Sequence, residues 1–204
     1  MSGVIRRTLS RAMAKRIGTH DGKFHADEAL ACAILRMTSE FADAAVVRTR
    51  DAAVLSHMDA VVDVGGVYDP HAHRYDHHQP TFHGTYDAAH RTLLSSAGLV
   101  FKHFAPTILR EKFDLTDDTA QRTVLRKLYD DFVEPFDGVD NGVPRVPADV
   151  SPAYAAPFSL CAYVAALNPA WNDPAPDADA SFMRAVAILG DAFRLVLERA
   201  VRSW

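Results

Sequence analysis

The chain has 204 residues, of which 49% are hydrophobic, and a formal net charge of −4 at neutral pH. This length and composition provide for a full hydrophobic core and exclude a mainly disordered chain. The two cysteines, Cys32 and Cys161, lie in apolar runs without a short-range pairing motif, so we expect reduced, buried thiols in an intracellular protein. No apolar run approaches the ~20 residues of a bilayer-spanning helix, and no membrane partner is expected.

Residues 1–15 differ in composition from residues 16–204, which we expect to form one domain. The first sixteen residues carry five basic side chains and no acidic one. They resemble a mitochondrial targeting segment, or they form a disordered basic arm; both interpretations stay open. We expect the protein in the mitochondrion or elsewhere inside the cell, in the nucleus or the cytosol. The other residues hold 17 of the 22 basic side chains and all 26 acidic ones, so this acidic body of charge −9 binds nucleic acid poorly unless divalent cations offset its carboxylates.

Residues 16–66 alternate between strand and helix patterns. The predicted strands are 16–20, 44–49 and 59–66, and the predicted helices are 27–37 and 51–57. This alternation predicts an α/β fold with a parallel sheet, flanking helices and right-handed crossovers.

Polar side chains stand where these strands end. His20, His25 and Asp27 are expected to meet in the crevice beyond a strand's carboxyl end, where open α/β sheets bind ligands. Alternatively, Asp27 and Glu28 only complete the helix terminus, where the helix dipole favours negative charge. Asp63 ends an apolar strand before two glycines, so it either caps a turn or holds a metal ion.

Five of the ten histidines lie within residues 71–83, around the sequence Asp76-His77-His78. Imidazole is a common neutral metal ligand and titrates near physiological pH. The tract therefore indicates metal binding, proton transfer or both, and the alternative is a solvated histidine-rich loop.

The rest of the chain is predicted to be helical. The predicted helices are 93–104, 116–132, 158–167 and 179–204, with aromatic side chains of the first two in the core. Between the second and third of them, Asp137 and Asp140 stand on either side of Gly138 in a predicted loop, and prolines follow.

These motifs carry a resemblance. His20, His25-x-Asp27, Asp63 with its glycines and Asp76-His77-His78 occur in the order of the first three motifs of the DHH phosphoesterase superfamily. The chain is more closely similar to the melanocyte-proliferating-gene exonuclease family, from about Arg16 to its C-terminus. The matching motifs are Ile17-Gly-Thr-His, Asp27-Glu-Ala-Leu-Ala-Cys, Val47-Arg-Thr-Arg-Asp, Val61-Val-Asp-Val-Gly-Gly, Tyr75-Asp-His-His-Gln, Leu94-Ser-Ser-Ala-Gly-Leu, Val139-Asp-Asn-Gly and Leu167-Asn-Pro-x-Trp-Asn.

The resemblance implies a DHH-type Rossmann-like lobe with two divalent cations. One ion would be held by His20, His25 and Asp63, and Asp63 would bridge to the other. The second ion would have the ligands Asp27, His77 and Asp140, and His78 would stand free as a catalytic general acid or oxyanion partner. Asp140 is favoured over Asp137 because Asn-Gly follows it, as in the family pattern.

Two departures from the related patterns affect these expectations. His25 stands where other DHH enzymes generally carry Asp, and this softer ligand set favours Mn²⁺ over Mg²⁺. Tyr163 and Ala166 occupy places where the family usually carries basic residues. Nothing in the chain resembles the second, substrate-binding lobe of DHH enzymes, so residues 1–204 are expected to be a weak or inactive enzyme by themselves.

The function implied is that of a metal-dependent phosphodiester hydrolase, a 3′–5′ exonuclease in RNA processing. Its partner would be single-stranded RNA or a short oligonucleotide, and the oligomeric state stays open. Two alternatives remain: a small-molecule phosphohydrolase acting on pyrophosphate or short oligonucleotides, and a non-catalytic metal-binding scaffold. The absence of basic residues near the site would favour the scaffold.

Overall fold

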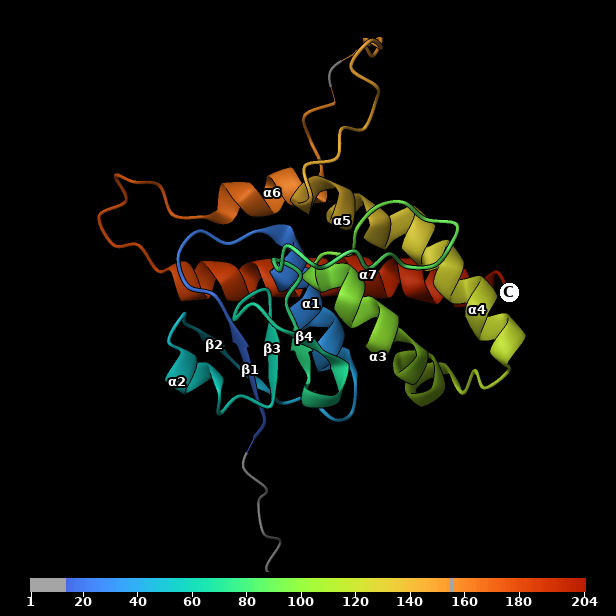
Figure 1. Ribbon diagram of the computed structural model, residues 1–204, viewed down its shortest axis with the longest axis horizontal. Coiled ribbons are helices and arrows are strands. Elements are labelled where there is room, and N and C mark those ends of the chain that lie inside the picture. Colours follow the sequence, from blue (N-terminus) through green and yellow to red (C-terminus); the bar gives the residue numbers. More distant parts are fainter. Residues whose placement is uncertain (1–13, 155) are drawn as a thin grey trace, which may run out of the picture.

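The computed structural model describes residues 14–154 and 156–204, and its centre is a five-stranded sheet of order β2–β1–β3–β5–β4 (Figure 1). The strands are β1 (Arg16–Thr19), β2 (Ala45–Arg48), β3 (Ala60–Val62), β4 (Tyr68–Asp69) and β5 (Arg74–Tyr75). β2, β1, β3 and β5 run parallel, and β4 pairs antiparallel with β5. The predicted α/β class is confirmed. The segment predicted to be targeting-like, 1–15, lies outside the described residues except for its last two positions.

Helices follow or separate these strands. They are α1 (Ala26–Met37), α2 (Ala52–Leu55), the 3₁₀ turn η1 (Pro70–Ala72), α3 (Ser96–Phe113), α4 (Asp118–Leu128), the π-helical turn η2 (Tyr129–Val133), α5 (Glu134–Asp140), α6 (Leu160–Leu167) and α7 (Ala178–Arg202). The part after the sheet is helical, as predicted. None of the described helices combines the length and the apolar character that a bilayer crossing requires.

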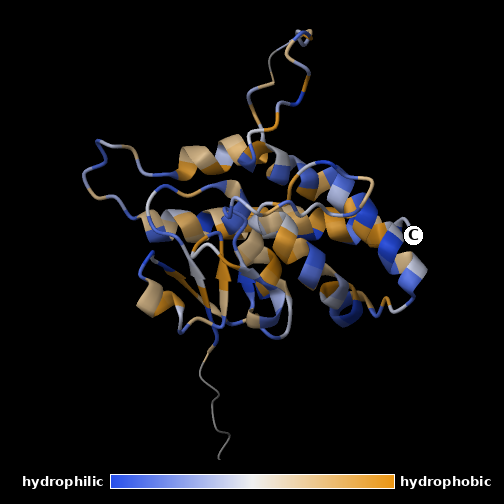
Figure 2. Ribbon diagram, in the orientation of Figure 1, coloured by the Kyte–Doolittle hydropathy of each residue, from blue (hydrophilic) through white to orange (hydrophobic). Residues whose placement is uncertain are grey.

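The two faces of the sheet are covered unequally. Ile17 and Val62 point into the main core, which α1, α3 and α7 complete. On the opposite face lies a small cluster that contains Leu55 and Met58, next to the short helix α2. Gly18 faces this cluster, and a Cβ there would lie 2.9 Å from both side chains, so the strand needs glycine at this position. Figure 2 shows hydrophobic residues concentrated in the strands and on the inner sides of the helices.

Helix α1 lies at the centre of the molecule. Every residue from Ala26 to Leu35 is buried, and the helix packs against α3 and α7. Small side chains permit this close packing: a Cβ at Gly190 of α7 would meet that of Ala33 at 3.5 Å. The surrounding core therefore fixes the position of the first turn of α1, which lies at the carboxyl edge of the sheet.

Three predictions about the helical part need correction. The predicted loop around Asp137 and Asp140 is helix α5, joined to α4 by the π-helical turn next to Pro135, which lacks an amide hydrogen. The helix predicted to end at Phe104 continues to Phe113, because burial of further apolar side chains offsets the hydrogen bond lost at its internal proline. Cys32 is buried as predicted, whereas Cys161 is only half-buried.

Candidate metal centre

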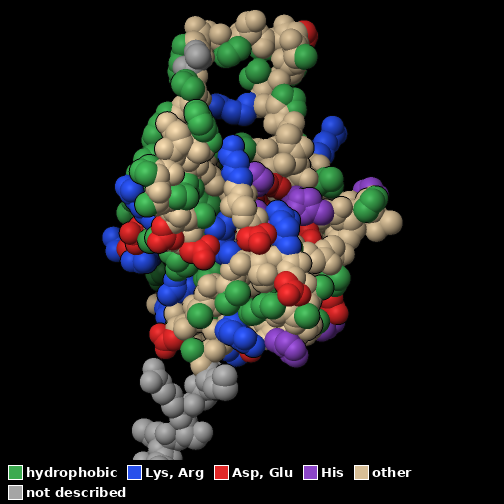
Figure 3. All heavy atoms as spheres, turned by 90° about the vertical axis from the view of Figure 1, so that its left-hand side faces the viewer, with side chains coloured by type: hydrophobic (Ala, Val, Ile, Leu, Met, Phe, Trp, Pro, Cys, Tyr) green, Lys and Arg blue, Asp and Glu red, His purple; other side chains and the backbone are tan. Residues whose placement is uncertain are grey.

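Histidine and carboxylate side chains gather at the carboxyl edge of the parallel sheet. His20 follows β1, Asp63 follows β3, and His77 lies two residues beyond β5. The first turn of α1 and the last residue of α5 complete this group, with Asp27 and Asp140. Because parallel strands end at the same edge, side chains far apart in the sequence become neighbours. Figure 3 shows histidine, acidic and basic side chains side by side on this face of the molecule.

The nitrogen and oxygen atoms of these side chains approach one another closely. The Nε2 atom of His20 lies 3.3 Å from one oxygen of Asp63, and the Nε2 atom of His77 lies 3.3 Å from the other. His77 Nε2 is also 3.1 Å from Asp140 Oδ2, and His20 Nε2 is 3.0 Å from Glu28 Oε1. Two ligands that bind one octahedral cation at about 2.1 Å are themselves about 3 Å apart. The spacing therefore suits ligand atoms that share cations, with Asp63 in contact with both histidines.

Several buried polar atoms of this group make no hydrogen bond of good geometry with another described residue, even where an opposite partner lies near. They are Asp27 Oδ1, Glu28 Oε2, Asp63 Oδ1 and His77 Nε2. A buried polar atom without a partner costs free energy, and a carboxylate oxygen costs most. A divalent cation would satisfy such atoms. Among the described residues, three sets at this centre have ligand atoms close enough to hold an ion: His20, His25, Glu28 and Asp63; Asp63, His77 and His78; and His25, Asp27 and Asp140. A fourth set, His90, Asp130 and Glu134, involves none of these residues.

The electrostatics of the centre show an excess of negative charge. Burial raises the pKa of Asp27 well above its usual range, and the carboxylates of Asp63, Glu28 and Asp140 raise it further. Burial alone would lower the pKa of His20, but the hydrogen bonds with Asp63 and Glu28 raise it to about 10. Without an ion, the carboxylates thus hold a proton on the imidazole, at the place where a cation would otherwise supply positive charge.

Asp63 is held in an uncommon backbone conformation. Its φ angle is 58°, and its amide donates to the carbonyl of Tyr75 across the sheet. Asp tolerates this left-handed region better than most side chains, and such residues are often found at functional sites. The glycines that follow, Gly65 and Gly66, also have positive φ angles, of 96° and 68°. The tight turn directs the Asp63 carboxylate toward both histidines.

His78 is oriented by its neighbour Asp76. Its Nδ1 atom lies 2.7 Å from Asp76 Oδ1, and the other Asp76 oxygen accepts the amide of Gly66 at 2.6 Å. The carboxylate of Asp76 is buried, whereas the side chain of His78 is 61% exposed. Asp76 therefore fixes the ring orientation of His78 and leaves its Nε2 atom free to meet a substrate.

Three supporting residues were not given these roles by the sequence. Glu28 belongs to the ligand group, although its place in a helix's first turn suggested only a dipole contact. Ser96 donates a hydrogen bond of 2.7 Å to Asp27. Asp137, fully buried, accepts hydrogen bonds from Ser95, from Gly98 and from the hydroxyl of Tyr129. The position of Glu28, three residues after His25 on a helix, was a signal that could have been used.

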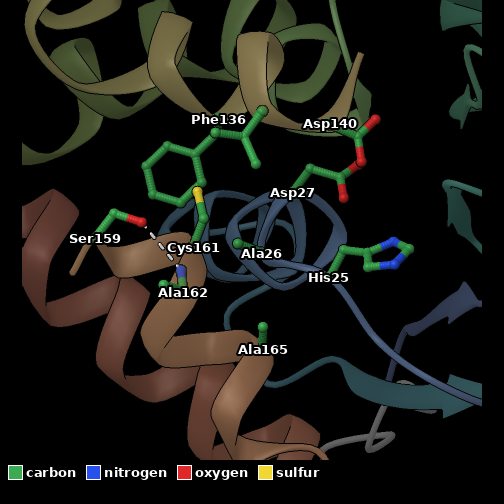
Figure 4. A pocket seen from close by; sticks show the side chains of 10 residues that line it. His25, Ala26, Asp27, Phe136, Asp140, Ser159, Cys161, Ala162 and Ala165 are labelled. Carbon is green, nitrogen blue, oxygen red and sulfur yellow. Dashed lines mark hydrogen bonds between the residues drawn. The ribbon is translucent and has the colours of Figure 1, made fainter. Parts of the chain in front are cut away.

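Two cavities open on either side of His25. The first, about 320 Å³, is here called the basic pocket: Lys23 and Arg50 line it together with His20, Asp63 and His78. The second, about 370 Å³, is here called the apolar pocket and lies between α1, α5 and α6. In Figure 4, Phe136 and Cys161 stand at one end of it, and His25, Asp27 and Asp140 at the other. The centre is thus flanked by a basic surface and an apolar surface.

Fold and site together define an α/β lobe with a histidine–carboxylate centre, able to hold metal ions, at the carboxyl edge of its sheet. The family described as "Uncharacterised protein family (UPF0160)", MYG1_exonuc, matches residues 16–204. The chain belongs to this MYG1 exonuclease family.

Several relatives show the same similarity. MYG1 exonuclease of Homo sapiens is 46% identical over 206 residues, which cover 98% of this chain and 54% of the relative. The Mus musculus protein of the same name is 47% identical over 93% of this chain and 51% of its own. "MYG1 protein" of Dictyostelium discoideum is 41% identical over 92% of this chain and 57% of its own. The chain thus spans about half the length of these curated relatives, and no solved structure matches it.

Proposed function

We propose that this chain is the metal-binding lobe of a divalent-metal-dependent phosphodiester hydrolase of the DHH type, a 3′–5′ exonuclease acting on single-stranded RNA or short oligonucleotides. The names of its relatives support a nuclease. The observation that carries the proposal is the group of buried histidine and carboxylate side chains that meet at Asp63 from two sides, several of whose polar atoms lack a hydrogen bond.

In this proposal the centre holds two ions. His20, His25 and Asp63, with Glu28, would hold one of them. The second would have the ligands Asp27, His77 and Asp140, and the two oxygens of Asp63 would serve both ions. Two bound divalent ions supply positive charge to phosphoryl oxygens and a nucleophilic water at neutral pH. The mixed nitrogen and oxygen ligands favour Mn²⁺ over Mg²⁺.

Side chains of the protein would supply proton transfer and hold the ligands in position. His78, oriented by Asp76 and exposed at the basic pocket, would give a proton to the leaving oxygen as general acid. Ser96 and Asp137 keep the ligand side chains in place. Ser96 donates to Asp27, and Asp137 fixes α5 one turn before Asp140.

The basic pocket argues against a purely structural metal site. Lys23 lines it and has no carboxylate partner among the described residues, and Arg50 makes a single exposed ion pair of 3.3 Å with Asp21. Basic side chains beside the centre are what a phosphate-bearing substrate requires, and a scaffold has no need of them. This favours catalysis over the scaffold alternative.

Turnover measurements with Mn²⁺ test the proposal. Single-stranded RNA, a dinucleotide and pyrophosphate are offered to the wild-type chain, to His78→Ala and to His57→Ala, a control in an exposed histidine remote from the ligand sets. We expect mononucleotides released from the 3′ end, a loss of roughly 10²–10⁴-fold in His78→Ala with metal content unchanged, and no loss in His57→Ala. Turnover of pyrophosphate alone would support the small-molecule alternative, and metal binding without turnover of any substrate would support the scaffold.

A further inference from the structure

The apolar pocket is continuous with the metal centre. Phe136 and Val139 of α5 form one wall, and Ala162 and Ala165 of α6 lie on the other side. Its volume of about 370 Å³ falls within the range of about 300–1,000 Å³ that small-ligand pockets occupy. His25, Asp27 and Asp140 belong both to its lining and to one candidate ligand set. A group bound in this pocket therefore lies next to a phosphate bound at the centre.

The charge of the lining decides what the pocket can hold. Its charged side chains are the carboxylates of Asp27 and Asp140, at the end toward the metal centre. A phosphate deep in the pocket would meet only repulsion and apolar walls, whereas a neutral base and sugar would bury apolar faces against aromatic and aliphatic side chains. The phosphates of a strand belong instead at the basic pocket on the other side of His25, with Lys23 and Arg50.

The lining offers little to read the identity of a base. Among the described residues that line the pocket there is no Asn, Gln, Arg or Lys. Ser159 Oγ already accepts the amide of Ala162 as the cap of α6, at 3.1 Å. Burial raises the pKa of Cys161 to about 11, so its thiol stays neutral and is a weak donor. Such walls recognise the face of a base rather than its edge.

We propose that the apolar pocket binds the terminal nucleoside of a nucleic acid strand, with little preference among bases, while the strand's phosphates lie at the metal centre and the basic pocket. This inference rests on the proposed function, and it names the part of the substrate that this chain holds beside the metal centre. A terminal nucleoside bound there would place its neighbouring phosphate at the metal centre, and each cleavage at that phosphate would then release one nucleotide.

Binding of reaction products tests the pocket without any turnover. Adenosine and cytidine 5′-monophosphates and ribose 5-phosphate are titrated into the Mn²⁺-loaded chain by calorimetry. Ala165→Trp fills the pocket, and Ala166→Trp is its matched control, because both alanines are exposed on α6 but only Ala165 lines the pocket. Ala162→Phe closes the pocket independently, should the first variant fold poorly.

We expect both nucleotides to bind at least tenfold more tightly than ribose 5-phosphate, and within about fivefold of each other. Ala165→Trp and Ala162→Phe should abolish the difference, and Ala166→Trp should keep it. Equal affinities for nucleotides and ribose 5-phosphate, or an unchanged difference in both pocket variants, would overturn the inference. The two proposals can fail separately. Nucleotide binding without hydrolysis of any substrate would refute the nuclease function alone. Hydrolysis by a chain that binds nucleotides no more tightly than ribose 5-phosphate would refute the nucleoside-binding role of the pocket alone.

Discussion

Asp63 is the residue on which both sides of the candidate centre depend. Its two oxygens each lie 3.3 Å from a different imidazole, and its left-handed backbone turns the carboxylate toward both. The neighbouring imidazoles, which outweigh the opposing effect of burial, lower its pKa to about 2. Asp63 is therefore ionised over the physiological range, as a bridging ligand must be.

Asp63→Ala should remove both metal ions. The wild-type chain purified in Mn²⁺ should contain close to two ions per chain by elemental analysis, and the variant close to none, because one side chain serves both sets of ligands. Asp43→Ala removes an exposed acid and serves as the control. Full occupancy in Asp63→Ala would refute the bridging role.

The pH dependence of metal binding should follow the two buried histidines. Burial alone would lower the pKa of His77, but Asp140 and Asp63 raise it to about 10, as Asp63 and Glu28 do for His20. A proton and a metal ion compete for each imidazole. Apparent Mn²⁺ affinity should therefore rise between about pH 6.5 and 10, by roughly one to two orders of magnitude per pH unit, with proton release measurable by calorimetry in two buffers. An affinity that is the same at pH 6 and pH 8.5 would speak against histidine ligation.

In the metal-free chain, raising the pH has the opposite effect on His20 and His77: it lowers the stability of the fold. Since the folded-state pKa values of His20 and His77 exceed the unfolded value of about 6.5, their ion pairs stabilise the fold fully below that pH. This contribution is lost as the pH rises through about 10. The metal-free protein should accordingly melt at lower temperature at pH 9 than at pH 6.5, and thermal scans in a chelator measure the difference. An equal melting temperature would show that these contacts are not formed without metal.

At the scale of single residues, the order and the chemical type of the side chains predicted the candidate ligands. His20, Asp27, Asp63 and His77 follow strands or begin a helix, and strand ends at one sheet edge must meet. Glu28 could not be assigned in this way, because its place in a helix's first turn is equally well explained by the helix dipole. Separating the two explanations required the position of the neighbouring His20 ring.

At the scale of elements, α5 depends on its contact with α3. Asp137 accepts hydrogen bonds from the backbone amides of Ser95, at 2.9 Å, and Gly98, at 3.1 Å, so an acid of α5 caps the first turn of α3. Asp140 lies one turn further along α5 and thereby faces His77. Burial, although hydrogen bonds oppose it, raises the pKa of Asp137 to about 6, so the cost of burying the charged carboxylate exceeds what these hydrogen bonds return.

Gly98→Ala should loosen this contact. A Cβ at Gly98 would overlap both carboxylate oxygens of Asp137, so we expect a loss of about 1–3 kcal/mol and a melting temperature roughly 3–10 °C lower. Binding of the ion on the Asp140 side should weaken as well. Gly138→Ala is the control: nothing lies within 4 Å of its Cβ position in α5, and helix propensity predicts a small stabilisation. Equal effects of the two substitutions would argue against the anchor.

Helix α5 also shows where a sequence pattern misleads. Pro135 and Gly138 lie close to Asp137, and this composition is typical of a loop. The segment is helical because Phe136 is buried in the core and Asp137 is held by α3, and these tertiary contacts outweigh local propensity. In contrast, the regular alternation of residues 16–66 predicted every parallel strand of that stretch, since buried strands leave a strong apolar signal.

At the scale of the molecule, the centre joins elements that are otherwise separate in the chain. Its candidate ligands follow β1, β3 and β5 and belong to α1 and α5. A cation bound there links the sheet to both helices. Metal binding should thus be coupled to the stability of the whole domain.

Mn²⁺ at about 100 times its dissociation constant should stabilise the wild-type chain by ~2.7 kcal/mol, or roughly 5–10 °C in melting temperature. The Asp63→Ala chain should show no such shift. Differential scanning calorimetry with and without a chelator makes the comparison. An equal shift in the variant would place the stabilising ion elsewhere.

The apolar pocket is the part of the molecule that no sequence pattern indicated. Its walls come from α5 and α6, and the α6 side includes two alanines, which carry no chemical signal. A cavity depends on how far apart two helices lie, and this distance is set by packing with the rest of the core.

The burial of α1 has an evolutionary consequence. This helix supplies Asp27 and Glu28 at its first turn and core side chains along the rest, so a substitution that repacks its middle also shifts the reacting groups. Substitutions in α1 are therefore constrained both by core packing and by the position of the candidate metal ligands. The alanines of α6 are exposed and do not belong to the main core, so substitutions there leave the position of Asp27 and Glu28 unchanged. New ligand preferences can therefore evolve, or be engineered, along α6 while the candidate metal ligands stay in place.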